Sequence, residues 1–238
     1  MKAPIFAGAT DTGRQRDHNE DAFAIATDLG VAIVADGMGG HAAGEIASEL
    51  AVTTTLAILG QTVGLAAHDR LETAVQAANA GIRERAIQSP RYKGMGTTLV
   101  AALLDREGLT VANVGDSRLY RLRRGTLVPL TRDHSLLQEF IDKGLYSPEE
   151  ARQKVARNIL THALGLEDHT RVDITSHDVQ SGDRYLLCSD GLHEMVSDDE
   201  IAALLGRSQP LQSISQTLVE LANAKGGKDN ITVVAIET

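Results

Sequence analysis

Four aspartates of this sequence lie where a run of apolar residues gives way to a turn: Asp36, Asp133, Asp190 and Asp229. Three of them are followed directly by glycine or asparagine, which favour tight turns and let other backbone approach closely. The apolar runs beside these three, at 31–35, 185–189 and 231–236, predict buried strands. Carboxylates at strand ends can converge on a cation, because hard cations prefer oxygen ligands. The pattern therefore predicts a metal site.

The acidic balance of the chain argues against nucleic acid as a partner. The sequence has 32 acidic and 23 basic residues and a formal charge of −9, whereas phosphate backbones are bound by clusters of Lys and Arg. One short basic cluster, Arg121, Arg123 and Arg124, is explained by an exposed hairpin tip.

No segment predicts a membrane span. The most apolar window, 48–67, is interrupted by polar residues and indicates an amphipathic helix that runs into a loop. The N-terminal residues lack the long apolar stretch of a signal peptide. The single cysteine, Cys188, rules out an internal disulfide, and its apolar surroundings in the sequence indicate a core thiol. We therefore expect a soluble protein of the cytoplasm.

The chain predicts a single domain over residues 1–238, because it has no linker-like tract and no repeat. Helical periodicity appears in three segments: 46–57, 71–85 and 211–221. Capping boxes at Ser147 and Ser197 predict two further helix starts. Strands are predicted at 31–35, 97–104, 109–114, 117–122, 126–130, 170–174, 183–188 and 231–236. Short turns between consecutive strands favour antiparallel sheets, which with these helices give an α+β fold.

Six short motifs carry the residues that could do chemistry. In chain order they are RDHNED (16–21), VADGMGG (34–40), GDSR (115–118), TRDH (131–134), CSDGLHE (188–194) and KDNIT (228–232). Any one of them is a weak signal, since a lone Asp-Gly is usually a turn. Together and in this order they resemble the metal-dependent Ser/Thr protein phosphatases of the PPM, or type 2C, family, and its compact bacterial members in particular. The resemblance runs from about residue 7 to residue 236, nearly the whole chain.

The resemblance implies a fold and a set of roles. The family fold is a central sandwich of two antiparallel sheets flanked by helices, in four layers (α-β-β-α). Asp36 would bridge two divalent cations, and the Gly37 carbonyl, Glu20, Asp190 and Asp229 would complete their ligands. Positions that hold a weaker third cation in bacterial members correspond to Asp133, Glu194 and again Asp190. Arg16 would bind the substrate phosphate.

The chemistry of these residue types agrees with the implied roles. Oxygen ligands favour Mn²⁺ or Mg²⁺ over Zn²⁺, which prefers cysteine or histidine. Two such cations about 3.5–4 Å apart lower the pKa of a bridging water, and the resulting hydroxide can attack phosphorus directly. A guanidinium suits phosphate because its planar fork forms paired, charge-assisted hydrogen bonds. The resemblance thus implies hydrolysis of phosphoserine and phosphothreonine, and the residue chemistry requires no covalent phosphoenzyme.

The general acid stays unassigned. Many eukaryotic relatives have a histidine two residues after the bridging aspartate, where this chain has Met38. His41 belongs to a different position of the motif, and His162 stands where bacterial relatives often have arginine. A metal-bound water is an alternative proton donor. Asp21, Asp116 and Arg118 are interpreted as structural.

The resemblance also implies partners: phosphorylated proteins as substrates and a Ser/Thr kinase as antagonist, with the chain acting as a monomer. Residues 136–160 correspond to the flap beside the family's active site. The competing hypothesis is a non-catalytic phosphoprotein-binding module on the same fold, which loss of the metal aspartates would indicate; all of them are present. Cysteine-based and aspartyl-phosphate phosphatases are excluded because their motifs are missing.

Overall fold

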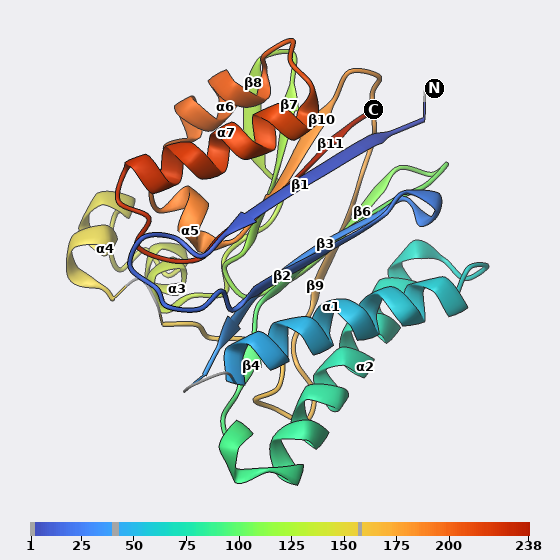
Figure 1. Ribbon diagram of the computed structural model, residues 1–238, viewed down its shortest axis with the longest axis vertical. Coiled ribbons are helices and arrows are strands. Elements are labelled where there is room, and N and C mark those ends of the chain that lie inside the picture. Colours follow the sequence, from blue (N-terminus) through green and yellow to red (C-terminus); the bar gives the residue numbers. More distant parts are fainter. Residues whose placement is uncertain (1–2, 40–42, 157–158) are drawn as a thin grey trace.

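Two antiparallel sheets pack face to face, and helices cover both outer faces, in the computed structural model of the chain (Figure 1). The structure describes residues 3–39, 43–156 and 159–238. Every strand pair in these ranges is antiparallel. The α+β fold with four layers, predicted from the sequence, is confirmed.

The first sheet has the strand order β1-β11-β10-β7-β8. Its strands are β1 (Ile5–Asp11), β7 (Arg118–Arg123), β8 (Thr126–Pro129), β10 (Arg184–Cys188) and β11 (Ile231–Glu237). The second sheet has the order β2-β3-β5-β6-β9, and β4 pairs with the end of β3. Its strands are β2 (Asp21–Ala26), β3 (Val31–Met38), β4 (Gly96–Thr97), β5 (Leu99–Leu104), β6 (Leu109–Val114) and β9 (Asp173–His177).

The helices form two groups on opposite sides of the sandwich. In Figure 1, α1 (Ala43–Gln61) and α2 (Ala67–Gln88) cover the second sheet, while α6 (Asp198–Leu205) and α7 (Leu211–Ala224) cover the first. Shorter helices lie at one side of the molecule: α3 (Leu136–Asp142), α4 (Pro148–Lys154) and α5 (Asp190–His193). Two 3₁₀ turns, η1 (Thr27–Leu29) and η2 (Pro90–Tyr92), complete the description. Among the described residues, no helix is both long and apolar enough to cross a membrane.

Three apolar clusters follow from the alternation of side chains along central strands. Val31, Ile33 and Ala35 of β3 face the layer of α1 and α2, whereas Ala32 and Val34 face the other sheet. Successive residues of a strand point to opposite faces, so a strand covered on both sides must be apolar throughout. This is why residues 31–35 and 231–236 appear in the sequence as unbroken apolar runs.

Helix α1 presents its smallest residues to the second sheet. The sequence predicts one face with Ile46, Leu50, Thr54 and Ala57, but these residues are half-buried or exposed. The buried side is made instead of small residues, among them Ala47 and Ala51. Small side chains allow the helix axis to approach the strands closely, which the bulkier face could not do.

Capping motifs in the sequence predicted helix starts accurately, whereas the residue pattern predicted edge strands poorly. Both predicted capping boxes are present, at the N-termini of α4 and α6. The sequence analysis missed β1, β2, α3 and α5, and it placed β9 about three residues early, at 170–174 rather than 173–177. The predicted strand 97–104 is divided into β4 and β5 at Thr98.

One buried ion pair ties the hairpin of β7 and β8 to the start of β10. Asp183 is 1% exposed and accepts hydrogen bonds from Arg123 at 2.7 and 2.6 Å. The Gln180 N–H (2.8 Å) and the Tyr185 hydroxyl (3.0 Å) also donate to this carboxylate. Burial alone would raise the pKa of Asp183, but these hydrogen bonds outweigh it and hold the pKa below its ordinary value of 3.8.

We expect Asp183→Asn to lower the free energy of unfolding by about 2 kcal/mol at neutral pH, because Arg123 loses its charged partner. A depressed pKa stabilises the folded state above the ordinary value of 3.8, and this contribution is lost as the pH falls through the folded-state pKa. The difference between wild type and variant should therefore shrink below that pH in urea titrations. Asp178→Asn, at a residue 66% exposed, is the control; an equal loss there would contradict the assignment.

Candidate metal centre

Acidic side chains from distant parts of the chain line one cavity of about 220 Å³. Its charged residues are Arg16, Glu20, Asp36, Asp116, Asp190 and Asp229. Larger cavities of about 410 and 600 Å³ exist elsewhere, but neither gathers acidic side chains in this way; a neighbouring acidic cavity of about 410 Å³ shares Asp116 with this one. The chemistry of the lining, rather than the volume, marks this cavity as the candidate site.

Asp36 lies near the end of β3, and its backbone is held on both sides. Its N–H donates to the Thr98 hydroxyl at 3.0 Å. Its carbonyl accepts from the Thr97 hydroxyl and the Thr98 N–H, each at 2.9 Å. These bonds leave the Asp36 carboxylate as the part of the residue that is free to bind a ligand.

Glu20 reaches the cavity because two glycines allow close packing around it. A Cβ atom added to Gly37 would lie 2.1 Å from the Gly44 carbonyl oxygen and 2.6 Å from that of Glu20. A Cβ atom added to Gly44 would lie 2.6 Å from Glu20 Oε1. The start of α1 therefore rests directly on β3 and on the Glu20 side chain. Neither glycine position has room for a methyl group.

Asn230 fixes the loop that carries Arg16 and Glu20. Its side-chain amide donates to the carbonyls of Thr12 (2.8 Å) and His18 (2.9 Å), and its oxygen accepts the Glu20 N–H at 2.7 Å. The preceding residue, Asp229, accepts a hydrogen bond from Arg16 at 2.6 Å. The turn that precedes β11 therefore orients three side chains together: the carboxylates of Asp229 and Glu20 and the guanidinium of Arg16.

Asp190 enters the cavity from the end of β10, at the first residue of α5. Its Oδ1 is buried, and no hydrogen-bond partner for it is found within the described parts of the chain. A buried carboxylate oxygen left in this state costs roughly 1–3 kcal/mol. A bound cation would satisfy it.

The pKa values show how strongly the carboxylates repel one another. Burial, then the charges of Asp21, Asp190, Asp116 and Asp229, raises the pKa of Asp36 well above its ordinary value. Burial and the same kind of repulsion raise the pKa of Asp190. The pKa of Asp116 rises to about 7, from burial first and Asp133 second. Like charges in a partly dry cavity favour either protonation or a bound cation.

Oxygen donors, a buried unpaired carboxylate oxygen and mutual repulsion together fit hard divalent cations. Within residues 3–39, 43–156 and 159–238, no three His, Cys, Asp or Glu side chains already have ligating geometry around one point. The fit therefore rests on the donor chemistry and on the shared cavity.

The structure does not bring Asp133 and Glu194 into this cavity. Both Asp133 oxygens accept hydrogen bonds from Arg118, at 2.8 and 2.6 Å. With Glu194, Asp133 lines a neighbouring cavity of about 410 Å³. Asp116 lines both cavities. We interpreted Asp116 as structural from the sequence, although it follows the apolar run 109–114 closely, as Asp36 and Asp190 follow theirs.

The remaining predicted residues fall outside the cavity. Asp21 accepts a hydrogen bond from the Ser189 hydroxyl at 2.7 Å, which agrees with a structural role. His162 packs edge-on against His134 with ring centroids 5.2 Å apart. Burial raises the pKa of the Cys188 thiol to about 12, so it is inert. His41 lies outside the described residues.

Comparison with known proteins gives one consistent result. The family model for protein phosphatase 2C matches residues 10–231. The chain is 42% identical over 235 residues to the serine/threonine phosphatase Stp of Listeria welshimeri, covering 96% of this chain and 93% of that protein. The structure of the S. agalactiae serine/threonine phosphatase superposes with a TM-score of 0.92 at 36% identity, covering 99% of both chains. The catalytic domain of the phosphatase PstP, in complex with two manganese ions, superposes with a TM-score of 0.87 at 37% identity, covering 98% of this chain and 97% of that one.

We expect Gly44→Ala to lower the free energy of unfolding by about 1–3 kcal/mol, because the added methyl group would overlap Glu20 and Gly37. Gly60→Ala, in the same helix, is the matched control. A Cβ atom there meets only Leu29, at 3.9 Å, so better helix propensity should stabilise the protein by about 0.5–1 kcal/mol. Urea unfolding of both variants is the measurement. An equal change in the free energy of unfolding in both variants would show that the close contacts at Gly44 do not exclude a methyl group.

Proposed function

Because this chain belongs to the protein phosphatase 2C family, we propose that the cavity around Asp36 is its catalytic centre. The protein is a metal-dependent serine/threonine phosphatase and acts on phosphoproteins. One observation supports the assignment of the site. A single cavity is lined by Arg16 and by four carboxylates from separate segments: Glu20, Asp36, Asp190 and Asp229.

The proposed ligands of two cations are the carboxylates of Asp36, Asp190, Asp229 and Glu20, with the Gly37 carbonyl. Gly37 supports this set because it lines the cavity beside Asp36. Mn²⁺ and Mg²⁺ both suit such oxygen donors. Cations bound there would lower the pKa of a water molecule and offset the charge of the phosphoryl group.

Arg16 is proposed to bind the substrate phosphate. Its side chain is 48% exposed, and one of its nitrogens is already fixed by Asp229. Partial burial lowers the pKa of Arg16, but the charges of Asp229, Glu20 and Asp36 raise it overall, so the guanidinium stays protonated. The Asp229 contact orients the fork, and its other N–H groups can donate to phosphate oxygens. Thr97 and Thr98 hold Asp36 in place during the reaction.

A third, weaker cation is proposed beside the first two, between Asp190 and the neighbouring cavity. Asp133 and Glu194 were the predicted ligands, and both line that cavity. The bidentate pair with Arg118 occupies Asp133, whereas Asp116 faces both cavities and its charge raises the pKa of Asp190. We therefore propose Asp116 as the main partner of Asp190, with Glu194 and Asp133 as outer contributors.

Five further properties belong to the proposal. The chain acts as one catalytic domain, 1–238, and as a monomer, and α3 and α4 (within 136–160) form a flap near the site. Leu160, at the end of this segment, lines the catalytic cavity and supports the flap assignment. A Ser/Thr kinase supplies the phosphoproteins, because the reaction requires phosphorylated serine or threonine. A cytoplasmic location is supported by the single, unpaired cysteine.

We expect Asp36→Asn to reduce turnover of p-nitrophenyl phosphate and of a phosphothreonine peptide by at least about 100-fold in Mn²⁺. In chelator, the same variant should unfold at a higher urea concentration than wild type, because one of the repelling charges is gone. Asp28→Asn, on the exposed 3₁₀ turn, is the control for both assays. Wild-type turnover that persists in chelator, or normal turnover of Asp36→Asn, would refute the proposed centre.

Two variants, Asp116→Ala and Asp133→Ala, show which of the two residues is a ligand of the third cation. We expect Asp116→Ala to weaken the weakest Mn²⁺ binding event in calorimetry while leaving stability in chelator unchanged or higher. Asp133→Ala should instead lower the free energy of unfolding by roughly 2–3 kcal/mol, because it strands the half-buried Arg118 charge. The reverse pattern would identify Asp133 as the ligand.

A further inference from the structure

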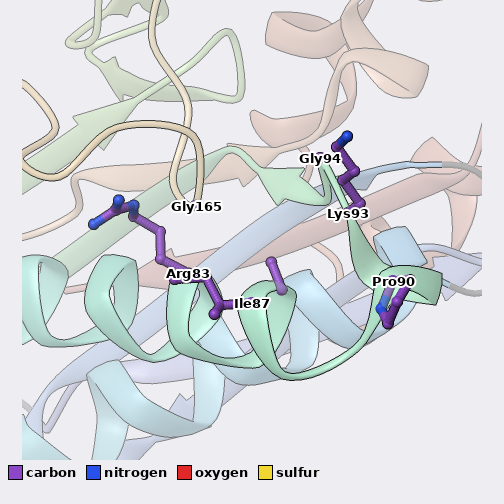
Figure 2. Close-up of a pocket in the computed structure, with 7 residues that line it drawn as sticks. Arg83, Ile87, Pro90, Lys93, Gly94 and Gly165 are labelled. Carbon is purple, nitrogen blue, oxygen red and sulfur yellow. The ribbon is translucent and has the colours of Figure 1, made fainter.

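A groove at the C-terminal end of α2 lies next to the catalytic cavity and has a different character. It has a volume of about 410 Å³ and is formed by the last turns of α2, the 3₁₀ turn η2 and Gly165. Figure 2 shows Arg83 and Lys93 on opposite sides of this groove, with Ile87 between them. No acidic residue lines it.

The groove is basic and apolar on a protein that is acidic overall. Residues 83–93 contain four basic side chains and one acidic side chain, whereas the whole chain has a charge of −9. Ile87 is 79% exposed and Leu166, beside Gly165, is 52% exposed. Exposed aliphatic side chains beside cations give this surface both apolar and charged groups with which another molecule can interact.

The groove and the catalytic cavity share no lining residue, but contacts around Gly96 connect them. Met38 lines the catalytic cavity, and Gly94 lines the groove. Gly96 pairs with Met38 in the short ladder of β3 and β4. A Cβ atom at Gly96 would lie 2.9 Å from Met38 Cε and 3.4 Å from Leu166 Cδ2. The apolar side chains of Met38 and Leu166, here called the ridge, therefore meet at Gly96, between the catalytic cavity and the groove. Gly94 lies two residues before Gly96, at most about 7 Å along the chain.

We propose that this groove binds the segment of the phosphoprotein substrate that flanks the phosphorylated residue, and that it selects acidic and aliphatic side chains there. The inference rests on the function proposed above. A chain that places its phosphate against Arg16 must leave the cavity in an extended form, and the ridge of Met38 and Leu166 leads it into the groove. Arg83 and Lys93 then meet carboxylates, and Ile87 meets an aliphatic side chain.

Asp168 competes with the substrate for the groove. Its carboxylate forms an ion pair with Arg83 across the rim, and its side chain is 81% exposed. Lys93 has no ion-pair partner among the described residues. An acidic substrate segment must therefore displace Asp168 from Arg83, while it can reach Lys93 directly. Removing the Asp168 charge should therefore strengthen binding of the acidic segment. If the ion pair were purely structural, its removal would not strengthen this binding.

The test compares three phosphothreonine peptides: one carries Glu and Leu on the N-terminal side of the phosphothreonine, one carries them on the C-terminal side, and one has neither residue. Lys93→Glu and Arg83→Glu should raise the KM for one acidic peptide roughly fivefold, and Asp168→Asn should lower it. None of the three should change KM or kcat for p-nitrophenyl phosphate, which has no flanking residues. Arg106→Glu is the matched control, because Arg106 is an exposed cation in the turn after β5, about 20 Å of strand away from Thr98.

Two results would overturn the proposal: unchanged KM for both acidic peptides in Lys93→Glu, or an equal loss with p-nitrophenyl phosphate. Fluorescence anisotropy of the labelled peptides in chelator measures binding without turnover. If the catalytic assignment failed, Asp36→Asn would keep normal turnover, yet anisotropy would still report whether Lys93→Glu weakens binding of the acidic peptide. The two failures are therefore distinguishable.

Discussion

Like charges held close together in a partly dry cavity are the constraint on which this structure depends. Burial and the charges of neighbouring carboxylates raise the pKa values of Asp36, Asp190 and Asp116, and one oxygen of Asp190 is buried without a hydrogen-bond partner among the described residues. Left to itself, such a cluster would splay apart or protonate. The fold prevents this by placing the acids on separate, well-packed elements, so that no single segment can relax to relieve the repulsion. Burial of three apolar clusters, two outside the sheets and one between them, stabilises the fold against this electrostatic repulsion.

Positioning the acids depends on unusually close packing around them. Helix α1 turns its small residues toward the sheet, and Gly44 touches Gly37 and Glu20 with no room for a methyl group. On the opposite side, the side-chain amide of Asn230 donates two hydrogen bonds and accepts one to hold the loop of Arg16 and Glu20. Side chains held in this way lose little entropy when they bind a ligand, because folding has already ordered them. The rigidity of the scaffold therefore contributes directly to the affinity of the site.

The sequence predicted the fold and most of the candidate site because their signals are local or ordered along the chain. Capping boxes at Ser147 and Ser197 fix helix starts by chemistry within four residues, and both are present. β1 was missed because its residues, IFAGATD, mix small and polar types and form an edge strand with little burial. Asp133 shows a different limit. A sequence cannot reveal that Arg118, fifteen positions away, takes both of its oxygens, so Asp133 and Asp116 could be distinguished only in three dimensions.

The distribution of charge explains how an acidic protein can still attract an anionic substrate. At physiological ionic strength, exposed charges separated by more than about 8 Å are largely screened, so the overall charge matters less than the nearest groups. Arg16 lies in the catalytic cavity, and Arg83 and Lys93 line the groove next to it. A phosphorylated segment that approaches along this side meets cations at short range before it meets the carboxylates. The same carboxylates, once neutralised by cations, become part of the binding surface. Attraction and catalysis can therefore be tuned separately, because the residues proposed to select a protein segment are not those proposed to hold the metal.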